Sequence, residues 1–232
     1  MKRFLIFLSF IIVIIFSACD TTAPIEIPED NPTNIALAGG NFDTWVEFSQ
    51  GELTYFKPAG DWWDGLNYLA VIGGPITYER TSDAYQGTNA LRLETKAWGE
   101  DLTIPGILAS GYFDPDETIG ENLIIGKPYD KNPTQFNGFI KYLPAENDTL
   151  VIFLALTKYN AELKLRDTIA TAEYTNTATM ETYTPFNIDI NYTHQTTPDS
   201  IHIILLSSVS GKEMKGHNGS VLFVDELSFT YE

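Results

Sequence analysis

Cysteine is almost absent from this chain. Cys19 is the only one among 232 residues, so no disulfide can form within one copy. Small exported domains that cannot bury a large core usually depend on disulfides. The folded part expected here, residues 38–232, is long enough to bury a core without them. Hydrophobic packing must therefore hold this domain together.

Long hydrophobic runs are also missing, apart from one short stretch at the N-terminus. Lys2 and Arg3 precede an apolar stretch from Phe4 to Phe16, which ends in small residues before Cys19. About 20 apolar residues are needed to cross a bilayer. This shorter stretch therefore predicts a cleaved secretory signal peptide over residues 1–18 rather than a membrane-spanning helix.

The residues around Cys19 predict a lipid anchor. The sequence FSAC resembles the lipobox of bacterial lipoproteins, whose cysteine becomes the lipid-modified N-terminus, although Phe16 stands where that motif usually has leucine. Residues 19–37 are rich in Pro, Thr and acidic residues without periodicity, which predicts a disordered tether. We therefore expect an exported protein held to a membrane through Cys19, at the outer membrane or surface of a Gram-negative cell.

Basic residues are scarce. Against 31 Asp and Glu there are 14 Lys and Arg, a formal net charge of −17. Without Lys2 and Arg3 of the signal peptide, 14 − 2 = 12 bases stand against 31 acids, or −19. Such a surface repels nucleic acid and anionic lipid, so a nucleic-acid partner is excluded. It suits neutral ligands such as glycans, and cations such as calcium, although acidity alone can also serve solubility.

Signatures of common catalytic sites are absent as well. The chain has no H-E-x-x-H, no G-x-S-x-G, no P-loop and no dinucleotide-binding glycine motif. Its three histidines, His194, His202 and His217, are scattered without metal-ligand spacing. Glycoside hydrolysis requires two carboxylates at a set separation, and 31 acidic residues do not single out a pair. The sequence therefore favours a binding protein and leaves open whether the chain is an enzyme.

Helical periodicity is weak throughout, whereas short strand-like segments recur. Each is rich in β-branched or aromatic residues and is bounded by Gly, Pro, Asn, Asp or Ser. They are ALRLETKAW, FNGFIKYL, TLVIFLALTKY, TPFNIDINYT, DSIHIILLSSV and SVLFVDELSFTY. Many short strands with frequent turns predict an all-β fold, an antiparallel β-sandwich of the jelly-roll type. No repeat or break in composition divides residues 38–232, so we expect a single domain.

Three segments match a known fold. An early NFDTW, a middle GTNALRL and a terminal DELSF together resemble the galactose-binding-like jelly rolls, which house many carbohydrate-binding modules. The second half, through FNGFIKY, PDSIHIILLSSVSG and GHNGSVLFVDELSFTY, is similar to the putative carbohydrate metabolism domain of Bacteroidetes lipoproteins. The resemblance implies a jelly roll that binds glycans or helps to process them, although a shared fold does not establish an activity.

The resemblance also implies a structural calcium ion (Ca2+). In many carbohydrate-binding jelly rolls, an Asp of the last strand binds calcium together with an early acidic residue and a loop before the middle strand. The matching positions are Asp43, Ser82, Asp83, Gly87 and Asp225. Calcium takes about six to eight oxygen ligands from carboxylates and carbonyls, which such loops supply.

Asp225 has its own reason to need a partner. In a regular strand, its alternating neighbours form one largely apolar face: Val221, Phe223, Leu227 and Phe229. A carboxylate on a core-facing side is costly unless a cation or several donors neutralise it. An ion pair with Arg92, or a turn cap at the rim of the strand, is the alternative to calcium.

Candidate sugar contacts come from segments that combine aromatic and polar residues. Sugars present flat C–H faces and a ring of hydroxyls, so these residue types suit them. The candidates are Trp62, Trp63, Asp64, Asn67, Tyr68, Trp98 and Tyr129. Aromatic residues make up 13% of the chain and can equally fill the core. Because adjacent residues of a strand point to opposite faces, at most one of Trp62 and Trp63 is expected to be core.

Three functions remain compatible with these patterns. A glycan-binding module predicts exposed aromatics on a groove and no convergent pair of carboxylates. A carbohydrate-active enzyme, of glycoside hydrolase type, predicts two carboxylates that face each other across a cleft. A structural or accessory subunit of an envelope complex predicts a broad exposed apolar patch and no groove.

Overall fold

The computed structural model describes residues 33–117, 123–210 and 215–231. The signal peptide, Cys19 and most of the predicted tether lie outside the described residues, so those predictions stay predictions. No helix within the described ranges is long and apolar enough to span a membrane. All of the described residues belong to one compact unit, Asn31–Glu232.

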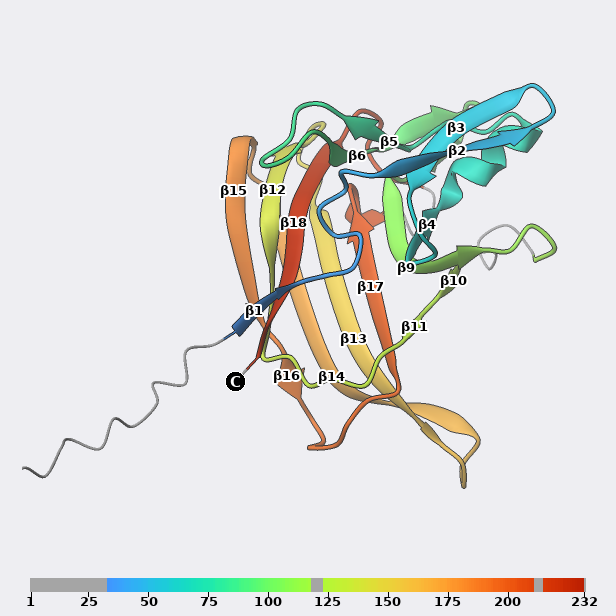
Figure 1. The fold of residues 1–232 in the computed structure, drawn as a ribbon. Coiled ribbons are helices and arrows are strands. Elements are labelled where there is room, and N and C mark those ends of the chain that lie inside the picture. The colour runs from blue at the N-terminus through green and yellow to red at the C-terminus, as the bar shows by residue number, and fades with distance from the viewer. Residues whose placement is uncertain (1–32, 118–122, 211–214, 232) are drawn as a thin grey trace, which may run out of the picture. The chain divides into compact units, whose positions relative to one another are not determined.

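The first of two large sheets has six strands (Figure 1). Their order is β15, β12, β18, β6 and β5, with β1 added beside β18, and all neighbours are antiparallel. The bounds are β1 Thr33–Ala36, β5 Tyr78–Thr81, β6 Ala90–Glu94, β12 Gln135–Leu143, β15 Met180–Asp189 and β18 Val221–Tyr231.

The second sheet has eight strands in the order β10, β9, β17, β13, β14 and β16, with β4 beside β9 and β11 beside β17. The bounds are β4 Trp63–Gly65, β9 Ile107–Phe113, β10 Leu123–Ile125, β11 Lys127–Pro128, β13 Leu150–Asn160, β14 Leu165–Asn176, β16 Asn191–Tyr192 and β17 Ser200–Leu206. Two small hairpins and one 3-10 helix complete the described fold: β2 Trp45–Gln50 with β3 Leu53–Pro58, β7 Lys96–Trp98 with β8 Leu102–Ile104, and η1 Leu66–Ile72.

Inward-facing side chains from both sheets form the main hydrophobic core. Phe136 and Ile140 of β12 and Ile152 and Leu154 of β13 belong to this core and are fully buried. Each side chain of this size contributes about 1.5–3 kcal/mol when it leaves water. The predicted all-β antiparallel sandwich is therefore confirmed.

The fold begins earlier than the sequence predicted. Strand β1, Thr33–Ala36, lies within the segment 19–37 that was expected to be a disordered tether. It pairs with Ser228–Tyr231 of β18, beyond the part of β18 that pairs with β6. The tether prediction is therefore wrong for residues 33–36, because these residues cover a strand edge that would otherwise expose unpaired backbone groups.

A β-bulge interrupts β18 at Glu226, whose φ is 51°. Asn137 of β12 pairs with Ser228, and Phe139 of β12 pairs with Asp225. Two steps along β12 therefore correspond to three steps along β18. This extra residue changes which side chains share a face. The core receives Leu222 and Val224 before the bulge, and Leu227 and Phe229 after it.

Asp225 therefore does not share a face with Leu227 and Phe229, and the regular alternation expected from the sequence is wrong at this point. Its carboxylate points to the outer face of the sheet. The loop between β5 and β6 reaches across the ends of β18 and β12 in Figure 1 and covers it there. Asp225 is buried by this loop and not by the core.

Candidate functional site

Two of the residues predicted to bind sugar are interior. Trp63 is 1% exposed, and its ring lies 5.7 Å from that of Phe42. Asn67 is fully buried: its Nδ2 donates to the carbonyl of Tyr78 at 2.7 Å, and its Oδ1 accepts from the N–H groups of Thr77 and Tyr78 at 2.8 and 3.1 Å. A ligand-binding role is therefore wrong for both: Trp63 fills the core, and Asn67 fastens η1 to β5 and the residue before it.

Asp64 also serves the structure. It is 8% exposed; its Oδ1 accepts from the N–H of Gly65 at 2.9 Å and from the hydroxyl of Tyr78 at 3.3 Å. Its Oδ2 accepts from Lys57 at 3.4 Å. Burial, and then the charge of Asp64, raise the pKa of the Tyr78 phenol well above its usual value, so this hydroxyl stays a donor.

The other predicted sugar contacts are half-buried. Trp62 packs against the main core, and Trp98 packs against a second apolar cluster around η1 and β8. Tyr68 stacks on Phe113 with ring centroids 5.0 Å apart. Tyr129 forms a 2.6 Å hydrogen bond with another tyrosine hydroxyl. None of the seven lines the groove described below, so the aromatic-rich segments mainly pack the sandwich.

Two of the residues predicted for calcium, Asp43 and Asp225, hold the same loop, residues 82–89. Asp225 Oδ2 accepts from the N–H groups of Tyr85 and Gln86 at 2.9 and 3.1 Å, and its Oδ1 accepts from the N–H of Glu226 at 2.9 Å. Burial raises the pKa of Asp225 to about 6, against the lowering effect of these three backbone donors.

Asp43 holds the other end of the same loop. Its Oδ1 accepts from the N–H groups of Thr88 and Asn89 at 2.6 and 3.1 Å, and these backbone donors hold the pKa of Asp43 below its usual value. Gly87 has a φ of +72°, and a Cβ built on it would lie 2.3 Å from Asp43 Oδ2. Only glycine fits this approach without strain.

This arrangement offers N–H donors to the carboxylates where a calcium ion would require further oxygen ligands. Ser82 lies in the same loop, and Asp83 pairs with Lys141. Nowhere in the described residues do three or more His, Cys, Asp or Glu side chains form a group that could hold a metal ion. The donor set therefore does not fit calcium as it stands, and calcium binding stays a prediction.

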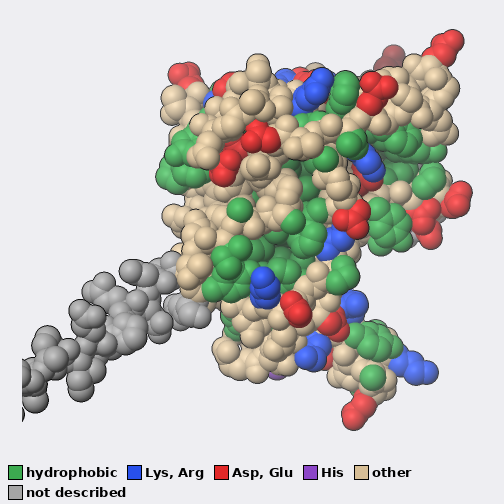
Figure 2. Space-filling model, viewed as in Figure 1, with side chains coloured by type: hydrophobic (Ala, Val, Ile, Leu, Met, Phe, Trp, Pro, Cys, Tyr) green, Lys and Arg blue, Asp and Glu red, His purple; other side chains and the backbone are tan. Residues whose placement is uncertain are grey.

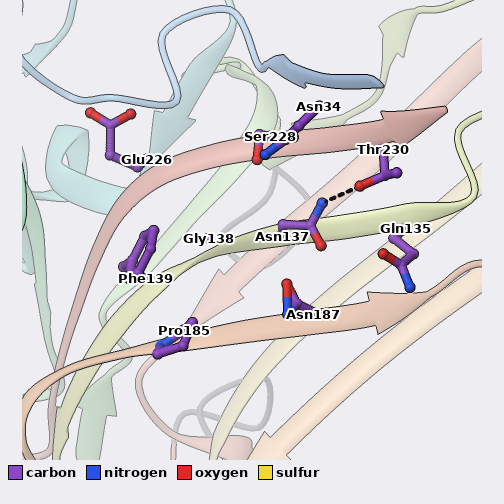
Figure 3. Close-up of a pocket in the computed structure, with 10 residues that line it drawn as sticks. All are labelled: Asn34, Gln135, Asn137, Gly138, Phe139, Pro185, Asn187, Glu226, Ser228 and Thr230. Atoms are coloured by element: carbon purple, nitrogen blue, oxygen red, sulfur yellow. Dashed lines mark hydrogen bonds between the residues drawn. The ribbon is translucent and has the colours of Figure 1, made fainter. Parts of the chain in front are cut away.

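A different surface has the chemistry of a binding site: the outer face of the six-stranded sheet (Figure 3). Asn137 of β12 lies between Asn187 of β15 and Ser228 of β18, each its direct register partner. Two residues along, Gln135 lies beside Thr230, which in turn pairs with Asn34 of β1. These are two cross-strand rows of mainly amides and hydroxyls, about 6.7 Å apart along the strands. The second row also contains a carboxylate, because Gln135 pairs with Asp189 of β15 and donates to its Oδ1 at 2.8 Å.

An aromatic surface follows at the next position along β12. Phe139 pairs with Pro185 on one side and with Asp225 on the other. Tyr85, held over the sheet by Asp225, stacks on Phe139 with ring centroids 3.6 Å apart and planes inclined by 11°. The loop and the sheet thus form a stacked pair beside the polar rows.

Two adjoining hollows cover the polar rows and the stacked pair. They measure about 280 and 420 Å³ and share Asn34, Phe139, Glu226 and Ser228, so we call them together the sheet groove. Glu226 is the only charged side chain among the described residues that line them. Burial, and then the charge of Asp43, raise the pKa of Glu226.

Sequence reasoning missed these residues. A signal was present, since QFNGF and FNID alternate polar amides with apolar residues as half-buried strands do. The alternation predicts a polar outer face, but it does not tell which strands place their amides side by side.

A larger hollow, of about 830 Å³, lies beside the end of the β13–β14 hairpin. Its aromatic lining residue is Tyr159, and charged residues of both signs surround it, including Lys158 and Asp167. The described residues that line it include neither a row of amides nor a stacked pair of rings. The sheet groove is therefore the stronger candidate site.

The family model described as "Putative carbohydrate metabolism domain" matches residues 39–230. The chain belongs to this family. The resemblance found in the sequence is therefore confirmed, and the match spans nearly all of the described fold.

Two solved structures share the fold of this family member. A putative glycoside hydrolase from Bacteroides thetaiotaomicron matches with a TM-score of 0.69 and 18% identity, over 85% of this chain and 72% of that chain. Another from Bacteroides vulgatus matches with a TM-score of 0.65 and 21% identity, over 84% of this chain and 96% of that chain. No curated protein matches the chain. At these identities the structures establish the fold and leave the activity open.

Proposed function

We propose that this chain is a glycan-binding module that holds a sugar chain in the sheet groove. The observation that carries the proposal is the cross-strand rows of Asn137, Asn187 and their neighbours beside the stacked rings of Tyr85 and Phe139. Amides donate and accept hydrogen bonds at once, as sugar hydroxyls do. An aromatic surface suits the flat C–H face of a pyranose ring.

The polar residues of the groove are available to a ligand. Among the described residues, the side chains of Asn34, Asn187 and Ser228 form no hydrogen bond to protein. Asn137 uses its Nδ2 to donate to Thr230 Oγ1 at 2.8 Å, which leaves its Oδ1 as an acceptor. Membership of a carbohydrate-related family supports glycans as the ligand class.

The enzyme alternative has less support in this groove. Glycoside hydrolysis usually needs an acid and a second carboxylate that face each other across the sugar. The described lining of the sheet groove contributes one carboxylate, Glu226. Binding is therefore the function we propose, and release of reducing sugar from a bound glycan, lost in Glu226→Gln, would favour catalysis instead.

The place of this module in the cell is part of the proposal. The sequence supports lipidation at Cys19 and an exported module held at the outer membrane or cell surface. Labelling of cells with a palmitate analogue should mark the wild-type chain and not a Cys19→Ser variant. An unlabelled wild-type chain would refute the anchor.

Glycan binding is tested by affinity electrophoresis of residues 20–232, which contain the whole compact unit. Asn137→Ala and Phe139→Ala should each weaken binding about ten-fold, since a hydrogen bond or an aromatic contact is worth about 1 kcal/mol or slightly more. Thr175→Ala, on the exposed surface of β14, is the matched control and should bind normally.

Thermal melts of the same variants separate lost affinity from lost folding. If both groove variants melt as the wild type and still bind as tightly, the sheet groove is not the site. If no glycan of plant, host or microbial origin binds, the accessory-subunit alternative takes precedence, and purification from native membranes would then identify its partner.

A further inference from the structure

The sheet groove differs in charge from most surfaces that bind acidic sugars. Proteins recognise carboxylate and sulfate groups with Arg and Lys, because these residues supply both charge and directed donors. The described residues that line the sheet groove include amides, hydroxyls, two rings and one carboxylate, but no Lys, Arg or His. Glu226 lines both of its hollows.

The nearest basic side chains along these strands are already engaged. Lys141, the next outward residue of β12 after Phe139, pairs with Asp83, and its Nζ lies 4.1 Å from the centre of the Phe223 ring. Arg92, on β6, donates to Glu79 at 2.6 Å and to Glu94 at 2.9 Å. These pairs keep both cations committed to the sheet beyond the aromatic end of the groove.

The face in view in Figure 2 does not supply the missing cations either. Figure 2 shows acidic and basic side chains interspersed over the visible face of the described residues, without a broad basic patch there. The chain as a whole carries 31 acidic residues against 14 Lys and Arg. A polyanionic glycan would therefore meet repulsion on approach as well as in the groove.

We infer that the sheet groove selects uncharged glycans and rejects uronate and sulfated chains, with Glu226 as the residue that enforces the rejection. This inference rests on the proposed function and deepens it. Glu226 lies at the β-bulge, between the aromatic end and the polar rows, so a sugar that spans the groove passes its carboxylate. A like charge about 5 Å away in water weakens binding about four-fold at low salt, and more where the pair is partly desolvated.

Two matched panels of polysaccharide test the inference on residues 20–232. Xyloglucan, galactomannan and barley β-glucan are uncharged, whereas polygalacturonate, alginate and chondroitin sulfate are acidic. EDTA is present throughout, so that divalent ions cannot bridge an acidic chain to the protein. We expect binding within the uncharged panel alone, with an affinity that is unchanged between low and high salt, because no ion pair contributes.

Two variants at the same position separate charge from shape. Glu226→Gln keeps the size of the side chain and removes its charge, so the affinity for acidic chains should rise about four-fold at low salt, by the one step of like-charge repulsion that is lost. Glu226→Lys reverses the charge and should bring acidic chains to measurable binding at low salt. It removes one four-fold repulsion and adds an attraction of the same size, so the affinity should be about 16-fold above that of the wild type. That gain should disappear at high salt.

The two proposals fail in different ways. If the wild-type protein binds an acidic chain, and Asn137→Ala abolishes this binding, the groove binds glycans but the charge selection is refuted. If Glu226→Lys folds normally and gains no affinity for any acidic chain, Glu226 is not the discriminating residue. If no polysaccharide of either panel binds, the proposed function falls, and the inference falls with it.

Discussion

Asp225→Asn should remove one pH-dependent component of folding stability. The pKa of Asp225 rises from 3.8 to about 6 because the loop of residues 82–89 buries its carboxylate. A carboxyl group whose pKa is raised on folding binds its proton more tightly in the folded state. Its contribution to stability is therefore complete below about pH 4 and is lost as the pH rises through about 6.

The magnitude follows from the shift. One pKa unit corresponds to about 1.4 kcal/mol, so the full difference is about 3 kcal/mol, most of which falls between about pH 4 and pH 7. Asparagine keeps an oxygen that can accept from the N–H groups of Tyr85 and Gln86, but it does not titrate. The free energy of unfolding of the wild type should therefore fall, relative to that of the variant, by about 2–3 kcal/mol over this range.

Urea unfolding at about pH 4, 5, 6 and 7 measures this difference. Other carboxyl groups with shifted pKa values, such as Asp43 and Glu226, are present in both proteins and cancel in the comparison. If plots of unfolding free energy against pH for the wild type and the variant stay parallel across this range, Asp225 does not titrate with a raised pKa. The account of a buried carboxylate held by backbone N–H groups would then be refuted.

Three further predictions concern the loop and η1. Gly87→Ala should lower stability by about 1–3 kcal/mol, since its Cβ would contact the carboxylate of Asp43 at a left-handed φ. Gly99→Ala is the control, with a φ of +75° and no atom within 4 Å of its Cβ, and should cost less. Asn67→Ala should lower the free energy of unfolding by about 3 kcal/mol, because it leaves buried backbone groups unpaired. In urea unfolding the midpoint should therefore fall while the m value stays unchanged. Thermal melts in calcium and in EDTA decide the calcium prediction: a melting temperature several degrees higher in calcium confirms it, and superimposable melts refute it.

Much of the fold could be predicted because strand patterns are local. Segments such as TLVIFLALTKY and DSIHIILLSSV carry enough apolar and β-branched residues to become buried strands in any sandwich. Local patterns do not distinguish a sugar-binding aromatic residue from one that fills the core, and the predicted sugar contacts therefore proved partly wrong. Trp63 and Asn67 look like sugar contacts in the sequence, but short strands and turns around η1 need the same residues to fill and fasten the interior.

The sheet groove could not be predicted because it depends on register between distant segments. Asn137 and Asn187 lie 50 residues apart in the chain, and Ser228 lies further still. A shift of one residue in either pairing would separate them and turn one side chain inward. Glu226 gives little local warning of its bulge, because it is neither Gly nor Asn, the residues that most often adopt a positive φ.

The bulge explains why the N-terminal segment belongs to the site. The turn of residues 37–40 continues the pairing of β1 with β18 as far as the residue after the bulge. Leu37 N–H donates to the carbonyl of Leu227 at 2.9 Å, and Leu227 N–H donates to the carbonyl of Gly40 at 3.0 Å. Gly40 allows this approach, since a Cβ there would lie 2.9 Å from that of Leu227. Consecutive carboxylates can therefore take separate tasks, with Asp225 holding the loop and Glu226 facing the groove. Changes at residues 37–40 should disturb both at once, whereas changes in the polar rows alter the ligand surface alone.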